Sequence, residues 1–384
     1  MFLTSKERQI LFFDKIVGLL VFFGTIIYCT LLFLNQNTVL MQKYLLLLSV
    51  FAFVATSTKG QDLMDELTKD QKKKTKEYVF ATFKSTRLIN GQTVEMTKKN
   101  ALDFRISHRF GNIASAPNDH IHNMFGFDQA ADILFSLDYG ILENLSAGWG
   151  RAKGNGALNE LWFANVKYRA LRQTTDFKYP MSISFLAQAA VSAQRQQKNA
   201  PELLQSFPKW YHRFSYVLQS QIAIKATSWL SLQLSPTFIW RNLVLPNDKN
   251  GLFVMGFLAR AKVSKRSAIV FEYFLPITKN GATFREYFPM VRGIKNAGYY
   301  PGIHLGYEIE TGGHVFQINL TNTGGLLEND YLVYNANNWA QGQFRLGFTI
   351  TRAFQFGKDI NPWTGRYTKK KLLQDMKARA EKAN

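Results

Sequence analysis

Hydrophobic and polar residues alternate along Leu102–Gly111, and similar alternation recurs through much of the chain. In this stretch Leu102, Phe104 and Ile106 share one parity, while the charged Arg105 has the other. Because successive side chains of a β-strand point to opposite faces, the pattern predicts a strand with one apolar and one charged face. A soluble sandwich buries its apolar face, whereas a transmembrane barrel turns that face to lipid and the charged face to its lumen.

From Leu102 onward the pattern predicts twelve strands. Their approximate ranges are 102–111, 131–140, 142–151, 158–170, 181–193, 211–225, 229–241, 252–263, 267–275, 299–310, 314–322 and 342–355. An earlier stretch, Tyr78–Ile89, is also strand-like, and the Asn90-Gly91 pair after it is a hairpin signal before Thr93–Asn100. We interpret this hairpin as a plug, a periplasmic element or two further wall strands.

The connections between the predicted strands alternate, though not strictly, between long and short. Most long ones follow odd-numbered strands: Asn112–Ala130, Gln194–Trp210, Asn242–Gly251, Pro276–Gly298 and Thr323–Gln341, with Ala152–Ala157 shorter. Most short ones follow even-numbered strands: Ile141, Ala226–Ser228, Ser264–Arg266 and Thr311–Gly313, with Leu171–Pro180 the longest. Outer-membrane barrels show this alternation because one rim carries long external loops and the other short periplasmic turns.

Aromatic residues support the same prediction, since Trp and Tyr cluster near the ends of the predicted strands, as they do at membrane interfaces. The predicted strands, about 10 to 15 residues long, match a tilted crossing of the hydrocarbon layer. Pro236 falls inside one strand and predicts a local bulge, because proline has no N–H for the ladder. The predicted fold is therefore an all-β transmembrane antiparallel barrel of about twelve strands.

The N-terminal sixty residues are typical of export. Ile16–Leu34 is long and apolar enough for a membrane helix, and Met41 then begins a charged, apolar and small-residue sequence that ends near Gly60. Residues 41–60 are predicted to be a signal peptide, and residues 1–40 a mis-called extension or a membrane helix. The alternative is two membrane helices within residues 1–60. The single cysteine, Cys29, lies upstream of the predicted mature chain, which excludes thiol chemistry and thiolate metal sites there.

Four stretches carry a resemblance to known proteins: Phe83–Gly91, Leu102–Gly111, Asp138–Gly140 and Gly148–Arg151. On these the chain resembles an uncharacterised family of Bacteroidota outer-membrane β-barrel proteins, a domain of unknown function. The similarity extends over about Tyr78 to Gly357. It implies the fold and the membrane location, and it implies no activity.

Parity also predicts which charged side chains face the lumen. The candidates are Arg105, Arg109, Lys167, Arg169, Arg213, Arg260, Lys262, Glu272, Glu308 and Arg345. Basic groups outnumber acidic ones on this face, and a positive lining favours anions. The predicted function is a channel or transport barrel for small polar, anionic solutes. The alternative is that these charges form ion pairs across a narrow lumen and fill it.

The sequence also allows two other functions. The first is a structural or accessory barrel that binds a partner protein through its long loops. The second is a rim hydrolase using His108 or His212, but no Ser-His-acid arrangement or Gly-x-Ser-x-Gly motif is present. We expect no enzyme, no catalytic residue and no cofactor. Asp119-His-Ile-His122 is more typical of a solvated loop than of a metal site, so none is predicted.

The chain has 47 Lys and Arg against 27 Asp and Glu, yet no nucleic-acid-binding motif accompanies this excess. The expected partner is the outer-membrane bilayer, and small anionic solutes are the expected cargo. The predicted organisation is an N-terminal arm and hairpin over 61–100, a barrel over 101–357 and a basic tail over 358–384.

Overall fold

The computed structural model describes residues 77–113, 124–154, 158–198, 204–245, 248–277, 299–311 and 313–357. The chain divides into two compact units, Met1–Thr75 and Lys76–Asn384, of which only the second contains described residues. The predicted signal peptide, the Asp119–His122 loop and the basic tail lie outside the described residues. Within the described ranges, no helix is both long and apolar enough to cross a membrane.

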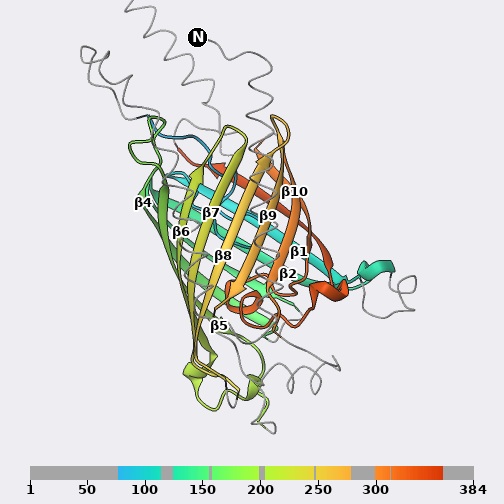
Figure 1. Ribbon diagram of the computed structural model, residues 1–384. Helices are drawn as coiled ribbons and strands as arrows, with labels where there is room; N and C mark the ends of the chain where they lie inside the picture. The colour runs from blue at the N-terminus through green and yellow to red at the C-terminus, as the bar shows by residue number, and fades with distance from the viewer. Residues whose placement is uncertain are drawn as a thin grey trace, which may run out of the picture. The chain divides into compact units, whose positions relative to one another are not determined.

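Twelve strands form one closed antiparallel barrel, as predicted (Figure 1). Their bounds are β1 Ala101–Asn112, β2 Ala130–Leu142, β3 Leu145–Lys153, β4 Glu160–Leu171, β5 Ser182–Ser192, β6 Phe214–Lys225, β7 Leu230–Arg241, β8 Gly251–Lys262, β9 Ser267–Pro276, β10 Gly302–Thr311, β11 His314–Thr321 and β12 Arg345–Gln355. Each strand pairs with its neighbours in sequence, and β1 closes the barrel on β12 with Arg105 opposite Thr351. Each predicted strand overlaps an observed one, with ends that differ by a few residues.

The alternation of long and short connections is also observed. One rim, here the long-loop rim, carries residues 113–129, 154–159, 193–213, 242–250, 277–301 and 322–344. The opposite rim, the short-turn rim, carries residues 143–144, 172–181, 226–229, 263–266 and 312–313 and lies uppermost in Figure 1. Short helices fall in the long connections: η2 (Met124–Gly126), η3 (Leu204–Ser206), η4 (Trp210–Arg213), α4 (Glu328–Tyr331) and η5 (Trp339–Gln341).

The two faces of the strands differ in chemistry, as β4 illustrates. Its outward Trp162, Val166 and Tyr168 are exposed, whereas inward Phe163 and Lys167 are buried. Large apolar side chains are exposed in the same way on the outer faces of most other strands. An exposed apolar band of this extent is stable only against an apolar solvent, which in a transmembrane barrel is the lipid.

The lumen contains two segments of the same chain. The inner hairpin, residues 82–97, precedes β1, and the inner loop, residues 323–336, joins β11 to β12. Both are almost entirely buried. The inner hairpin is linked to the short-turn rim on both sides, through bridges Tyr78 to Thr174 and Lys99 to Gly140, whereas the inner loop descends from the long-loop rim.

The expected strands around Asn90-Gly91 are absent. The chain does reverse there, because Leu88 N–H donates to Gly91 O (2.8 Å) and Arg87 bridges Gln92. The pairing is short: Thr93 N–H donates to Thr86 O (2.9 Å), and other backbone groups of the turn bond to side chains of the barrel wall. Gly91 permits this approach, because a Cβ there would lie 2.9 Å from Leu258 Cδ2.

Not all inward positions are polar, contrary to the simple parity expectation. On β6–β9 the lumen receives the apolar side chains Val217, Ile239, Leu252, Val254, Leu258, Val270 and Phe274. They pack against Leu88, Ile89 and Val94 of the inner hairpin and against residues 331–336 of the inner loop. The barrel interior is therefore a packed core on this side.

The bulge predicted at Pro236 is not present. The pairs Gln219–Thr237 and Ile222–Leu234 keep one register on either side of it, and Pro236 pairs with Met255 on β8. The ladder to β6 is only interrupted where proline lacks a donor. β7 therefore accommodates Pro236 without the extra residue that would form a bulge.

The orientation of the outer face can be tested at Leu218 of β6, which is 57% exposed. Replacing Leu218 with Arg places a charge in the hydrocarbon layer and should destabilise the barrel by about 2–4 kcal/mol. Equilibrium guanidinium unfolding in phospholipid vesicles measures this difference. The matched control is Val263→Arg in the short β8–β9 turn, 60% exposed, for which ~0–1 kcal/mol is expected. Equal costs at both positions would contradict a lipid-facing band.

Candidate functional site

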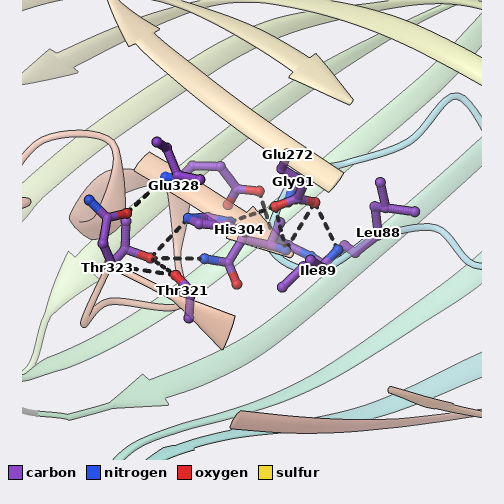
Figure 2. Close-up of polar contacts among 12 residues, drawn as sticks. Leu88, Ile89, Gly91, Glu272, His304, Thr321, Thr323 and Glu328 are labelled. Atoms are coloured by element: carbon purple, nitrogen blue, oxygen red, sulfur yellow. Dashed lines mark hydrogen bonds and ion pairs between the residues drawn. The ribbon is translucent and has the colours of Figure 1, made fainter. Parts of the chain in front are cut away.

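Glu272 of β9 binds the amide side of the inner hairpin turn. Its Oε1 accepts backbone N–H groups from Ile89 (2.7 Å) and Gly91 (2.9 Å), and its Oε2 accepts from Asn90 (3.1 Å) (Figure 2). Strand parity turns Glu272 inward, and the side chain is fully buried. A carboxylate that accepts three amide protons forms charge-assisted hydrogen bonds, which are stronger than neutral ones.

Arg105 of β1 binds the carbonyl side of the same turn. Its Nη1 donates to Arg87 O (3.0 Å), and its Nη2 donates to Leu88 O (3.3 Å) and Ile89 O (2.6 Å). The turn therefore lies between a buried anion at its N–H groups and a buried cation at its C=O groups. This is the favourable orientation of peptide dipoles between opposite charges.

His304 of β10 connects Glu272 to the inner loop. Its Nδ1 lies 2.7 Å from Glu272 Oε2, and its Nε2 lies 3.1 Å from Thr323 Oγ1. Because the carboxylate can only accept, a proton on Nδ1 satisfies that contact, and Nε2 then accepts the Thr323 hydroxyl. Thr321 Oγ1 lies 3.0 Å from Thr323 Oγ1 and extends the chain, as Figure 2 shows.

Hydroxyl, imidazole and carboxylate occur in this order in hydrolase triads. Here the three side chains are 0% exposed, and the Thr323 oxygen also accepts Arg109 Nη1 at 2.9 Å. No substrate carbonyl can approach a nucleophile enclosed in this way. The arrangement instead fastens the inner loop to the wall and, through Glu272, to the inner hairpin.

Arg109 and Arg87 join the two inner segments directly. Arg109 of β1 donates to Thr323 O (2.9 Å), to Gly325 O (3.1 Å) and to the Asn90 side chain. Arg87 Nη1 pairs with Glu328 Oε1 at 2.6 Å, and both side chains are almost fully buried. Burial works against the charge of Arg87, but the Glu328 carboxylate, together with Asp138 and Tyr331, raises the pKa of the guanidinium.

Further contacts seat α4 in the lumen. Gln188 of β5 donates to Glu328 Oε2 (3.1 Å) and Asn329 Oδ1 (2.8 Å), and Asn329 donates to Ser215 Oγ (2.8 Å). Burial, followed by the Glu328 and Glu272 carboxylates, raises the pKa of the Tyr331 phenol well above its ordinary value, so that this group stays neutral.

The structure separates the predicted luminal charges into three groups. Arg105, Arg109, Lys167, Arg260, Glu272 and Glu308 are buried inside the barrel, Arg169, Arg213 and Arg345 are half-buried, and Lys262 is exposed. Arg260 pairs with Glu308 (2.8 Å), and Arg345 pairs with Asp132 (3.2 Å). The pairing alternative raised by the sequence therefore applies to part of the set.

Several residues of this network were not predicted: Arg87, Asn90, Thr323 and Glu328. They lie outside the strands, so strand parity gives no information about them. One signal was available, because β8 is apolar on both of its faces and such strands are covered on both sides. The apolar inner face of β8 indicates that other residues cover it, but it does not identify those residues.

Neither histidine considered for a rim hydrolase has suitable partners. His108 points outward, and its ring stacks on Phe348. The His212 ring accepts a hydrogen bond from the Lys209 backbone N–H. In the described part of the chain, neither ring hydrogen-bonds to a hydroxyl or carboxylate, and no three His, Cys, Asp or Glu side chains gather as metal ligands would.

A closed antiparallel barrel with an apolar outer band and a filled lumen defines the class as a membrane-bound β-barrel. The particular family follows from the sequence. Residues 83–354 match the family described as "Membrane bound beta barrel domain (DUF5777)", and the chain belongs to this family. The matched region includes both the inner hairpin, but for its first residue, and the inner loop.

Solved structures with similar folds share little sequence. KdgM porin matches at 8% identity over 66% of this chain and 98% of its own, with a TM-score of 0.38. NanC porin matches at 9% identity over 67% and 99%, with a TM-score of 0.38. An active-site mutant of outer membrane phospholipase A from Escherichia coli matches at 10% over 67% and 91%, with a TM-score of 0.36. TM-scores this low support no statement about solutes or catalysis, and no curated protein matches.

Replacing Glu272 with Gln should release the turn of the inner hairpin. Glutamine keeps the shape but loses the charge and one acceptor oxygen, and each bond to a charged acceptor contributes about 1.5–3 kcal/mol. Hydrogen exchange at the amides of Ile89, Asn90 and Gly91 should accelerate by on the order of 10- to 100-fold.

The control is Glu310→Gln, which removes a partly exposed carboxylate paired with Lys84 at 2.6 Å. Such exposed pairs contribute roughly 0–1 kcal/mol, so exchange at the turn should change little. Unchanged exchange in the Glu272 variant would show that Glu272 does not hold the turn.

Proposed function

We propose that the protein is an outer-membrane barrel that is closed at rest and conducts small polar solutes, anions in preference, when its inner segments withdraw. Export by the predicted signal peptide is part of this proposal. Origin in Bacteroidota, suggested by the sequence resemblance, stays a prediction.

The observation that carries the proposal is the filling of the lumen by the chain's own segments. In an open pore the inward side chains would contact water, whereas Arg109, Glu272 and Glu308 are at most 1% exposed here. The inner hairpin and inner loop meet in mid-lumen, through Arg87 and Glu328. Solute passage therefore requires movement of at least one of them.

The wall is built so that such movement leaves it intact. Every wall strand is paired with two other wall strands, and neither inner segment contributes a strand to the ladder. Most contacts that hold the inner turn are hydrogen bonds to side chains, each of modest net free energy. A stable wall around a separately held interior is the arrangement expected of a gated channel.

A positive lining supports the preference for anions. Within the described strands, nine basic side chains face inward, among them Arg105, Arg109, Lys167 and Arg260, and six carboxylates share that face. Withdrawal of the inner loop would also remove its acidic Glu328 and Asp330 from the interior. The open wall would then have a stronger positive potential than the closed one.

The second candidate is an accessory barrel that binds a protein partner at its loops. A filled lumen suits such a role equally well. Exposed aromatic and sulfur-containing side chains lie at the long-loop rim, among them Phe125 (53%) and Trp210 (74%). Conductance measurements separate the two candidates, because an accessory barrel has no open state.

Glu328→Gln should increase opening in planar bilayers. The change leaves Arg87 buried without its carboxylate, and breaking a buried pair in this way costs roughly 3–5 kcal/mol. If that cost falls on the closed state, the open probability should rise by on the order of 100-fold. Wild-type protein should show rare, anion-selective openings.

Glu160→Gln is the matched control, since Glu160 lies half-buried on the outer face and pairs with the exposed Lys153 at 3.4 Å. It should leave the open probability unchanged. Folded Glu328→Gln protein that never conducts, under conditions where control porins do, would refute the gated channel and favour the accessory barrel.

A further inference from the structure

Most buried arginines of the lumen have a carboxylate partner. These pairs are Arg87–Glu328 (2.6 Å), Arg241–Asp248 (3.1 Å) and Arg260–Glu308 (2.8 Å), and the half-buried Arg345 pairs with Asp132 (3.2 Å). Arg105, Arg109 and Lys167 differ. Among the described residues, no carboxylate oxygen lies within 4.0 Å of their nitrogen atoms.

These three cations are also among the more deeply buried charges of the barrel. Arg105 is 2% exposed, Arg109 is 1% exposed and Lys167 is 3% exposed. A buried charge without a counter-charge is costly, and proteins usually pair or neutralise it. The wall therefore keeps three cations at a stability cost that pairing or neutral residues would avoid.

Neutral oxygens of the inner segments accept hydrogen bonds from these cations. Arg105 holds the carbonyls of Arg87, Leu88 and Ile89, Arg109 holds those of Thr323 and Gly325, and Lys167 Nζ holds Glu95 O at 2.7 Å. Each guanidinium contacts several oxygens at once. A guanidinium has the fork geometry that binds two oxygens of a carboxylate or phosphate.

We propose that Arg105 and Arg109 form two successive binding sites for small solutes that carry a carboxylate or phosphate group. The carbonyl oxygens of the inner segments occupy these sites in the closed state, and solute oxygens replace them when the segments withdraw. This inference rests on the proposed channel function. It goes further by naming the recognised group and the two residues that bind it.

The positions along β1 suit a sequential transfer. Arg105 and Arg109 lie on the same face four residues apart, which corresponds to ~13 Å along a strand. Arg109 is the nearer to the long-loop rim, and Arg105 lies deeper. Asp103, opposite Asp138 in register, lies one inward position closer to the short-turn rim.

The experiment uses the full chain with Glu328→Gln, in which the channel should open. Reversal potentials in a KCl gradient give the chloride-to-potassium permeability ratio, and added inorganic phosphate or acetate tests for block of the chloride current. Adding Arg105→Gln and Arg109→Gln should lower the permeability ratio at least about threefold and raise the half-blocking phosphate concentration about tenfold.

Two further variants make the result specific. Arg260→Gln with Glu308→Gln removes a paired charge of each sign, leaves the net luminal charge unchanged and should preserve both selectivity and block. Arg105→Lys with Arg109→Lys keeps the charge but loses the fork, so it should preserve selectivity and weaken the phosphate block. The lysine variant also provides a readout if the glutamine variant does not fold.

The possible outcomes are distinct. If the Glu328→Gln channel conducts and the Arg105 and Arg109 variants keep both anion preference and phosphate block, this inference is wrong and the channel function stands. If the Glu328→Gln barrel never conducts, both proposals fall. Equal loss in the Arg260–Glu308 variant would also contradict it, because selectivity would then not depend on the unpaired cations.

Discussion

The closed lumen depends on one arrangement: a short turn of backbone held between a buried carboxylate and a buried guanidinium. Glu272 binds the amide groups of the turn, and Arg105 binds its carbonyl groups. Neither charge has the other as a direct partner, so the peptide groups between them compensate both. Removing the turn would leave Glu272 with His304 and Arg105 with Ser107 as their remaining side-chain partners, so the position of the turn in the lumen is energetically well defined.

The remaining contacts of the interior extend from this arrangement. Glu272 contacts His304, and His304 contacts Thr323 of the inner loop. The Arg87–Glu328 ion pair links the inner hairpin directly to the inner loop. The apolar inward side chains of β6–β9 supply the bulk of the packing, while the polar network fixes which residue lies where. Apolar burial and polar specificity thus act together, since Glu272 itself lies on β9 beside the apolar Val270 and Phe274.

The wall could be predicted from sequence because strand parity and connection length are local properties. Alternation along Leu102–Gly111 gave both faces of β1, and the loop pattern gave the closed topology. The interior could not be predicted in the same way. Arg87 and Glu328 are 241 residues apart, and Glu272 and Ile89 are 183 apart, so no local pattern connects them. Parity placed Arg105 and Glu272 in the lumen, but it could not show that one is satisfied by carbonyls and the other by amides.

The position of the inner segments along the chain has a consequence for biogenesis. The inner hairpin precedes β1, and the inner loop follows β11 and precedes β12 by eight residues, while β1 and β12 pair to close the wall. Both strands of the closing ladder are therefore connected through short segments to the residues that fill the lumen. We expect formation of this ladder during folding to be coupled to insertion of the inner hairpin and the inner loop.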